Sequence, residues 1–482
     1  MNRSGRFPTL LVAGLLTVGA VAVVPPATAT AADPCTYCAG GEYHPITPTR
    51  IFDSRAAAEN DPLRPINDVA PLGAKPAGTA NPAFDVQLLG IGDENFANPW
   101  LPADVSSNNV LAVVASITVV TPTVRGYLGA YPAGSPSNTS IVNFSANQNV
   151  ANLSLVRPGD GDFLTVWLHA DTTGTAHVIV DVYGWFSTTG YLGADDTESE
   201  DERGGRLIPV APGRIYDSRP ASVGPTSVTE VTIRGADTLG ASPVTDIVPN
   251  STDVEGVLIN LTSTGSTAGT FVSVLPETPV GMPSTSNLNV LAGQTKANLV
   301  LVPVGADGKI RLYNHNGSTK LIVDVLGYIE RRLDDTRAGR VIPLTSPFRA
   351  LDTRQAAFGA VPIGPGIAED WSFAAFSASV NIGGVPVGNQ LGLLGNLTNA
   401  KLTRQYPTVA VSSYLTVYPT PPTNSLPPNV SSLNSVESTT ADAKAVPNMT
   451  MVMYGADQKV RVFNYQGYAH YILDVSAVIL AD

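Results

Sequence analysis

Along most of the chain, apolar residues occur in short runs rather than in helical patterns. Runs rich in Val, Ile, Leu and Thr are separated by turn sequences such as Ala306-Asp307-Gly308, which is typical of β-strands joined by tight turns. After the N-terminal segment, no window sustains apolar residues at i, i+3, i+4 and i+7, the spacing of an amphipathic helix. The clearest runs predict strands at 228–233, 254–261, 270–275, 286–290, 297–302, 309–313 and 320–329.

A set of landmarks recurs three times in the same order. Each copy begins with Pro, a spacer, Arg and then hydrophobic-Asp-Ser/Thr-Arg; it ends with a strand-like run that contains Asp. A segment that begins with Ser and ends with Asn lies between them. The repeated residues are Asp53, Asp217 and Asp352; Arg55, Arg219 and Arg354; Asn143, Asn289 and Asn434; and Asp181, Asp324 and Asp474.

The first and last repeated Asp of a copy are 107 to 128 residues apart, which is the length of one domain. We therefore predict an all-β protein of three tandem β-sandwich or jelly-roll-like modules. The predicted segments are module 1 at 46–187 with a Pro-rich insertion at 57–105, an acidic linker at 188–205, module 2 at 206–330, a linker at 331–340, and module 3 at 341–482.

The first 32 residues have the pattern of a cleavable signal peptide. Arg3 and Arg6 precede an uncharged run that ends before Pro25, and small residues follow. The run has about 15 residues, which is too short to span a bilayer. In the segment at 33–45, Cys35 and Cys38 are the only cysteines of the chain, and in an exported protein we expect them to form a local disulfide. A redox motif and a cross-link between chains are the alternatives.

Charge narrows the classes of partner. The net charge is −12, and it becomes more negative when Arg3 and Arg6 leave with the signal peptide. A negative protein is a poor partner for nucleic acid or for an anionic membrane surface. We expect a secreted or cell-surface protein with no membrane span after the signal peptide is removed.

The last strand of each copy indicates which residues face the core. Since side chains alternate along a strand, Val178, Val180 and Val182 share one apolar face, whereas Ile179 and Asp181 share the other. The repeated Asp should therefore point away from the core of its module. We predict that the first and last strands are neighbours, joined by a clasp in which Arg55, Arg219 and Arg354 bind Asp181, Asp324 and Asp474.

Other chemistry is less well supported. The pairs Asp53 with Asp181, Asp217 with Asp324 and Asp352 with Asp474 resemble the two carboxylates of a glycoside hydrolase, but a neighbouring Arg would lower the pKa that a general acid needs. The same carboxylates could hold a structural calcium ion. The five histidines lack the spacing of a metal site, so no catalytic residue, cofactor or metal ligand is assigned.

The repeated motifs resemble tandem repeats of exported actinobacterial proteins. The resemblance lies in Arg-φ-φ-Asp-Ser/Thr-Arg, where φ is hydrophobic, and in the terminal Asp-Val-φ-Gly-Tyr; it covers nearly all of residues 46–480, and copy three departs most, with Ser476-Ala477 in place of φ-Gly. In that family the repeats stand alone or beside hydrolase modules. The resemblance implies an exported protein built of tandem repeats. From the whole sequence we expect a non-catalytic binding or structural protein, with a cell-envelope glycan as its candidate partner. An extracellular glycan hydrolase and a self-assembling surface component are the alternatives.

Overall fold

The computed structural model describes most of the chain after residue 39. The described residues are 40–55, 83–89, 107–170, 172–188, 203–332, 336–375, 390–403, 411–422, 426–436 and 445–481, with short pieces at 4–5, 75–77, 101, 105, 191, 381–382 and 385–386. Cys35, Cys38, the acidic run of the first linker and most of the insertion lie outside these residues. Within the described part, no helix is long and apolar enough to cross a membrane.

Each module is a sandwich of two antiparallel layers of four strands, and the inner layers of modules 1 and 2 join into one sheet through the pairing of Gly205 with Tyr43. In module 1, β2 (Tyr43–Asp53), β10 (Gly174–Ser187), β5 (Val110–Val120) and β8 (Val150–Val156) form the inner sheet; β4 (Ala83–Gln87), β9 (Phe163–Ala170), β6 (Gly126–Pro132) and β7 (Val142–Phe144) form the outer one. The predicted all-β fold of three sandwich or jelly-roll-like modules is confirmed.

Modules 2 and 3 repeat this order strand for strand. The inner sheets are β11 (Gly205–Asp217), β18 (Lys320–Arg331), β13 (Val254–Thr264) and β16 (Lys296–Pro303), and then β19 (Val341–Asp352), β28 (Tyr468–Leu480), β23 (Gln390–Thr403) and β26 (Val446–Met453). The outer sheets are β12 (Ser227–Thr232), β17 (Lys309–Asn314), β14 (Thr270–Leu275) and β15 (Leu288–Val290), and then β20 (Ile367–Ser372), β27 (Lys459–Asn464), β24 (Ser412–Pro419) and β25 (Leu433–Val436).

A few short elements lie outside this repeat. They are β1 (Ser4–Gly5), which pairs in parallel with β20, then β3 (Lys75–Ala77), the hairpin β21 (Asn381–Ile382) with β22 (Val385–Pro386), and the 3₁₀ turns η1 (Ser107–Asn109), η2 (Asp160–Asp162), η3 (Ala356–Phe358) and η4 (Ala456–Gln458).

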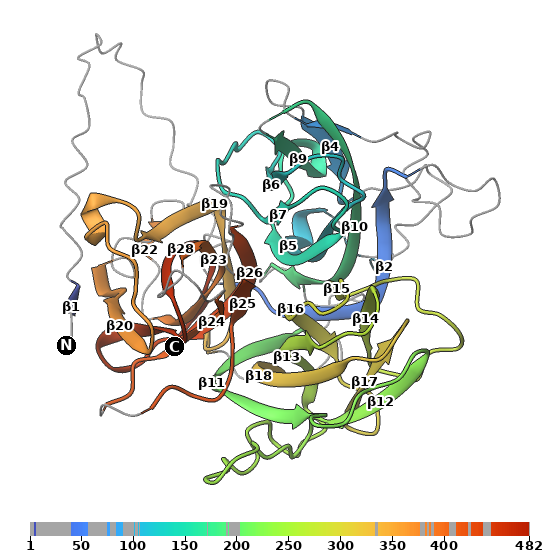
Figure 1. The fold of residues 1–482 in the computed structure, drawn as a ribbon, viewed down its shortest axis with the longest axis vertical. Coiled ribbons are helices and arrows are strands. Elements are labelled where there is room, and N and C mark those ends of the chain that lie inside the picture. Colours follow the sequence, from blue (N-terminus) through green and yellow to red (C-terminus); the bar gives the residue numbers. More distant parts are fainter. Residues whose placement is uncertain are drawn as a thin grey trace, which may run out of the picture.

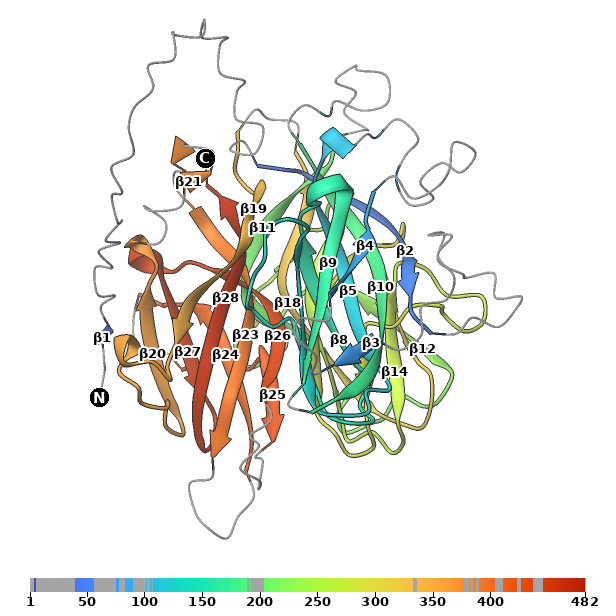
Figure 2. The same ribbon diagram turned by 90° about the horizontal axis from the view of Figure 1, so that it is seen from above.

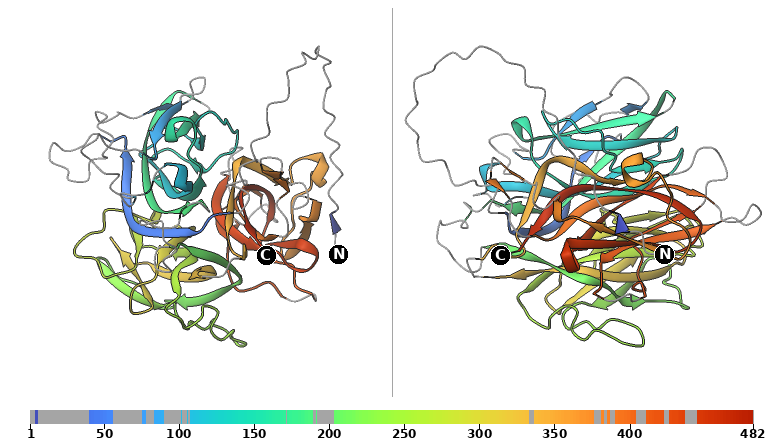
Figure 3. Two further views of the ribbon diagram at one scale, coloured as in Figure 1. Left: turned by 180° about the vertical axis from the view of Figure 1, so that it is seen from behind. Right: turned by 90° about the vertical axis from the view of Figure 1, so that its left-hand side faces the viewer.

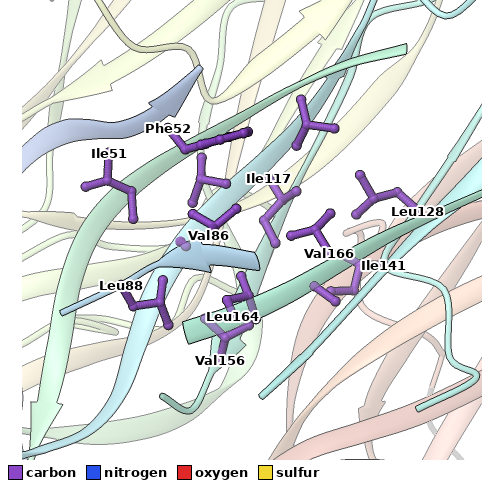
Figure 4. Close-up of a cluster of buried hydrophobic side chains, with 14 of the residues drawn as sticks. Ile51, Phe52, Val86, Leu88, Ile117, Leu128, Ile141, Val156, Leu164 and Val166 are labelled. Atoms are coloured by element: carbon purple, nitrogen blue, oxygen red, sulfur yellow. The ribbon is translucent and has the colours of Figure 1, made fainter. Parts of the chain in front are cut away.

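The apolar residues of the two sheets meet inside each sandwich. Val178, Val180 and Val182 are fully buried in the core of module 1, as the alternation along the last strand predicts. Figure 4 shows Leu164 and Val166 of β9 pointing toward Ile117 of β5 from the opposite sheet. Burial of these branched side chains supplies the main driving force for folding each module.

The three modules lie around a common axis rather than along a line. In Figure 1 each module occupies one sector around the centre of the molecule, and Figure 2 shows strands of all three running in similar directions. Strands β8, β16 and β26 come one from each module, and each contacts the other two. The views in Figure 3 show the same side-by-side packing from behind and from the left.

The centre of the molecule has an apolar core of its own, which we call the axial core. Equivalent positions of β8, β16 and β26 supply it in two layers: Leu153, Leu299 and Met449, and then Leu155, Leu301 and Met451. All of these side chains are buried except Leu155, which is partly buried. The inner sheets are therefore apolar on both faces, one for the module and one for the axis.

Candidate functional site

In each module, an arginine of the first strand clasps an aspartate of the last strand. In module 2, Arg214 Nε donates to Asp324 Oδ1 at 2.8 Å, and Nη2 donates to Oδ2 at 3.3 Å. Arg50 with Asp181 and Arg349 with Asp474 repeat this two-point geometry. The predicted pairing of first and last strands is confirmed, since β2–β10, β11–β18 and β19–β28 are antiparallel neighbours.

The arginine of the clasp is not the one predicted from the sequence. Arg55, Arg219 and Arg354 instead bind the aspartate two residues before them: Arg219 Nε lies 2.8 Å from Asp217 Oδ1. Strand register explains this correction, because Arg214 pairs directly with Asp324 across the ladder, whereas Arg219 lies beyond the end of β11. The Arg at the start of the motif therefore makes the clasp.

Each aspartate of these networks is engaged by a guanidinium group. Hydrogen bonds from Arg219 hold the pKa of the Asp217 carboxyl below its ordinary value. Burial raises the pKa of the Asp324 carboxyl, and Arg214 opposes that effect. Arg214 lies between the two carboxylates, 3.5 Å from Asp217 and 2.8 Å from Asp324, so guanidinium groups fill the place of the cation that a calcium site would need. A hydrolase would need one carboxyl free to donate a proton.

The clasp aspartates are buried more deeply than a single module explains. Asp181 is 1% exposed, and Asp324 and Asp474 are buried equally. Their strand face points away from the core of the module, as predicted, but a second module covers it. Arg50 Nη2 donates to the carbonyl oxygen of Ser284 in module 2 at 3.0 Å, and the backbone of Ser431 in module 3 hydrogen-bonds to Asp324.

The repeated Ser-x-x-Asn segments make these contacts between modules. In each segment the Asn Nδ2 donates to the Ser hydroxyl three residues earlier: Asn143 to Ser140, Asn289 to Ser286 and Asn434 to Ser431. Ser284, which contacts the clasp of module 1, lies two residues before the segment of module 2. Ser431 of the module 3 segment contacts the clasp of module 2. The segment of module 1 returns to module 3, where Asn396 beside Asp474 donates to the Ser140 carbonyl oxygen at 2.8 Å. The three modules thus form a closed ring.

Buried asparagine pairs connect the inner sheets at two of the three boundaries. Asn152 Nδ2 donates to Asn396 Oδ1 at 3.0 Å, and Asn448 Nδ2 donates to Asn260 Oδ1 at 2.9 Å. At the remaining boundary, Ser116 occupies the position of Asn260 and Asn396, because it pairs with Asp181 as they pair with their own aspartates. The Ser116 hydroxyl is buried without a hydrogen-bond partner.

A charged cluster joins the starts of the three modules at one end of the axis. Glu42, Arg206 and Arg340 occupy equivalent positions. Each directly follows a glycine and lies three residues before a proline. Glu42 Oε1 accepts from Arg206 Nε at 2.9 Å and from Arg340 Nη2 at 3.2 Å. The repeated motifs do not reveal this cluster; the alignment of the three module starts is the sequence signal for it.

The opposite end of the axis contains an open pocket of about 580 Å³, which we call the axial pocket. Val150, Lys296 and Val446 occupy equivalent positions at the beginnings of β8, β16 and β26, and all three line it. Two of the repeated asparagines, Asn143 and Asn434, line it as well. The pocket is also lined by Arg125, Tyr127, Gln148, His169, Gln294 and Arg354.

The two histidines of the repeat and the buried tryptophan make contacts that stabilise the fold. His177 and His470 hold Nδ1 at 3.0 and 3.1 Å from the backbone oxygens of Ser54 and Thr353. Among the residues that the structure describes, no three potential metal ligands of the His, Cys, Asp or Glu type gather. Trp185 is buried and stacks on His44, with ring centroids 4.3 Å apart.

Comparisons with known proteins assign no family. No family model and no curated protein matches the chain. The tandem CBM22 domains of Paenibacillus barcinonensis Xyn10C match at 10% identity over 59% of this chain and 98% of theirs. A triple jelly roll protein of an archaeal virus matches at 8% identity (91% and 90% covered), and a structure of Sulfolobus Turreted Icosahedral Virus at 10% (90% and 91%). All three have TM-scores of 0.17, too low to carry an argument about function.

Proposed function

We propose that this chain is a secreted, non-catalytic binding protein that holds a segment of cell-envelope glycan in the axial pocket. The observation that carries the proposal is that three modules close around one axis and leave, at its end, a pocket lined by all three. The export itself is proposed from the N-terminal sequence pattern.

The pocket lining suits a hydroxylated ligand. Gln148 and Gln294 offer amide groups, which both donate and accept hydrogen bonds. Tyr127 is half-buried and keeps one ring edge against Trp167, with centroids 5.3 Å apart. A few polar groups and an aromatic side chain in a concave site are the usual means by which proteins bind small ligands, and the volume is sufficient for a short oligosaccharide.

The clasp carboxylates support binding rather than hydrolysis. Each lies between or beside arginines, and the clasp aspartates are covered by a neighbouring module. In a hydrolase of the kind considered from the sequence, two accessible carboxylates would face a shared substrate. Their position at the module boundaries supports a role in holding the ring together.

The test uses the full secreted chain and intact cell envelope. We expect the chain to sediment with the envelope, to be released by soluble glycan, and to release no new reducing ends from the bound material. The variants Asp324→Asn and Asp181→Asn distinguish glycan binding from glycan hydrolysis. Reducing ends produced by the native chain and lost in these variants would establish a hydrolase and overturn the proposal.

A further inference from the structure

The charged residues around the axial pocket have one sign. The cations are Arg125 of module 1, Lys296 of module 2 and Arg354 of module 3, and His169 of module 1 adds an imidazole ring. Among the described residues that line the pocket, none is Asp or Glu. Arg354 is paired with Asp352 at 2.8 Å, and Lys296 is buried at the edge of the pocket. A concave surface of one sign focuses the field on ions of the opposite sign. The net negative charge of the chain makes this local excess of cationic groups more notable.

Lys296 is the unusual member of this group. It is only 8% exposed, although its position is occupied by Val150 in module 1 and Val446 in module 3. Its Nζ donates to the carbonyl oxygen of Asn289 at 3.2 Å. An ammonium group has three donors, so two remain for other partners at the edge of the pocket.

Burial of this lysine is costly unless a partner compensates. Burial lowers the pKa of Lys296 to about 8, which shows that the charged form is disfavoured where it stands. The valines at the equivalent positions show that the fold does not need a lysine there. A buried ammonium beside an open pocket is compensated when an anion enters, because opposite charges interact strongly away from bulk water.

We propose that the axial pocket binds the acidic group of its glycan, a carboxylate or a phosphate, through Lys296 with Arg125 and His169 around it. This inference rests on the proposed function and narrows its ligand class to acidic glycans. Uronic acids and sugar phosphates share the required chemistry, an anionic oxygen cluster on a hydroxylated ring. The amides of the pocket are then available for the hydroxyl groups.

The experiment measures binding of three probes to the full chain by calorimetry at pH 7 and low salt. The probes are trigalacturonate, glucose 6-phosphate and neutral maltotriose. We expect one or both acidic probes to bind at least tenfold more tightly than maltotriose. Lys296→Val should remove this preference, since the other modules show that Val fits the position. Lys309→Ala, which removes an exposed lysine of β17 paired with Glu230, is the matched control and should bind as the native chain does.

The outcomes distinguish the two proposals. Equal binding of acidic and neutral probes, unchanged in Lys296→Val, overturns the acidic ligand and leaves glycan binding in place. Binding of inorganic phosphate that depends on Lys296, without binding of any saccharide, keeps the anion site and overturns the glycan. If none of the probes binds, and the envelope does not retain the chain, both proposals fail. The relative affinities of trigalacturonate and glucose 6-phosphate decide which acidic group the site prefers.

Discussion

Glu42 and Arg206 form a buried ion pair although 164 residues separate them in the chain: Arg206 Nε donates to Glu42 Oε1 at 2.9 Å, and the Arg206 side chain is fully buried. Arg340 reaches the same oxygen from module 3. One Glu and two Arg therefore occupy three equivalent positions. If all three were Arg, three cations would meet near the axis, so the single Glu makes the ring electrostatically stable.

Replacement of this Glu should weaken the whole ring. We expect Glu42→Gln to lower the free energy of unfolding by about 3 kcal/mol, because it leaves Arg206, Arg340 and Arg203 near one another without their shared anion. Scanning calorimetry of the full chain measures the effect. Glu230→Gln, at an exposed pair with Lys309, is the matched control and should leave the transition unchanged. Equal transitions for both variants would show that Glu42 does not join the modules.

The clasp gives a comparison between two arginines of one motif. Arg214→Ala leaves buried Asp324 without its cation and should cost about 3 to 5 kcal/mol. Arg219→Ala breaks a pair whose arginine is half exposed and should cost less than about 1 kcal/mol. Denaturant unfolding of the two variants checks this order. The reverse order would show that Arg219 makes the clasp after all.

A charge exchange sharpens the same point. In the variant that combines Arg219→Asp with Asp324→Arg, we expect no recovery over Asp324→Arg alone, because Arg214 remains beside the new arginine. Thermal melting of the double and single variants measures this. A double variant that melts well above both single variants would place Arg219 next to Asp324.

The missing asparagine pair predicts a stabilising substitution. Ser116→Asn introduces the residue that modules 2 and 3 carry at this position. The new side chain would face Asn298, which holds in β16 the position of Asn152 in β8 and of Asn448 in β26. We expect a gain of about 1 kcal/mol, the usual net value of a satisfied buried hydrogen bond. Asn260→Ser is the reciprocal variant and should lose a comparable amount. Unfolding midpoints of the two should move in opposite directions; a lower midpoint for Ser116→Asn would contradict the equivalence of the three boundaries.

His44 should make stability depend on pH in the acidic range. Burial against Trp185 lowers its pKa to about 4, below the ordinary value of about 6.5. Between these values the unfolded chain binds a proton that the folded chain does not, so stability falls as pH decreases from 6.5 to 4. The loss from this residue is up to about 3 kcal/mol. His44→Gln should flatten this part of the profile; an unchanged slope would assign the pH dependence to other groups.

The class of fold and the positions of the strands could be predicted from the sequence. Alternation along residues 320–329 and the turn sequences between runs depend on local chemistry, and the structure has strands there. The run at 286–290 is strand only from Leu288, because Ser286 and Asn287 make contacts outside the ladder: Asn287 Oδ1 accepts from the Val274 backbone.

The arrangement of the modules could not be read from local patterns. A clasp aspartate such as Asp324 was expected to be only partly covered, because one module alone leaves its strand face open. The prediction that Arg219 binds Asp324 was wrong for a related reason. The strand register depends on a bulge in β11 between Arg214 and Tyr216, which the alternation of apolar and polar residues does not reveal. Apolar residues on the second face of the inner strands, such as Leu299 and Leu301, were the available signal for the axial core.

The central claim is that three modules close into one ring around the axial core, and small-angle X-ray scattering of the full secreted chain tests it most directly. A compact particle of about 450 residues has a radius of gyration near 22 Å. The closed ring predicts a value close to this and a globular scattering profile. A clearly larger radius, with the profile of modules separated along their linkers, would contradict the ring and the axial pocket that depends on it.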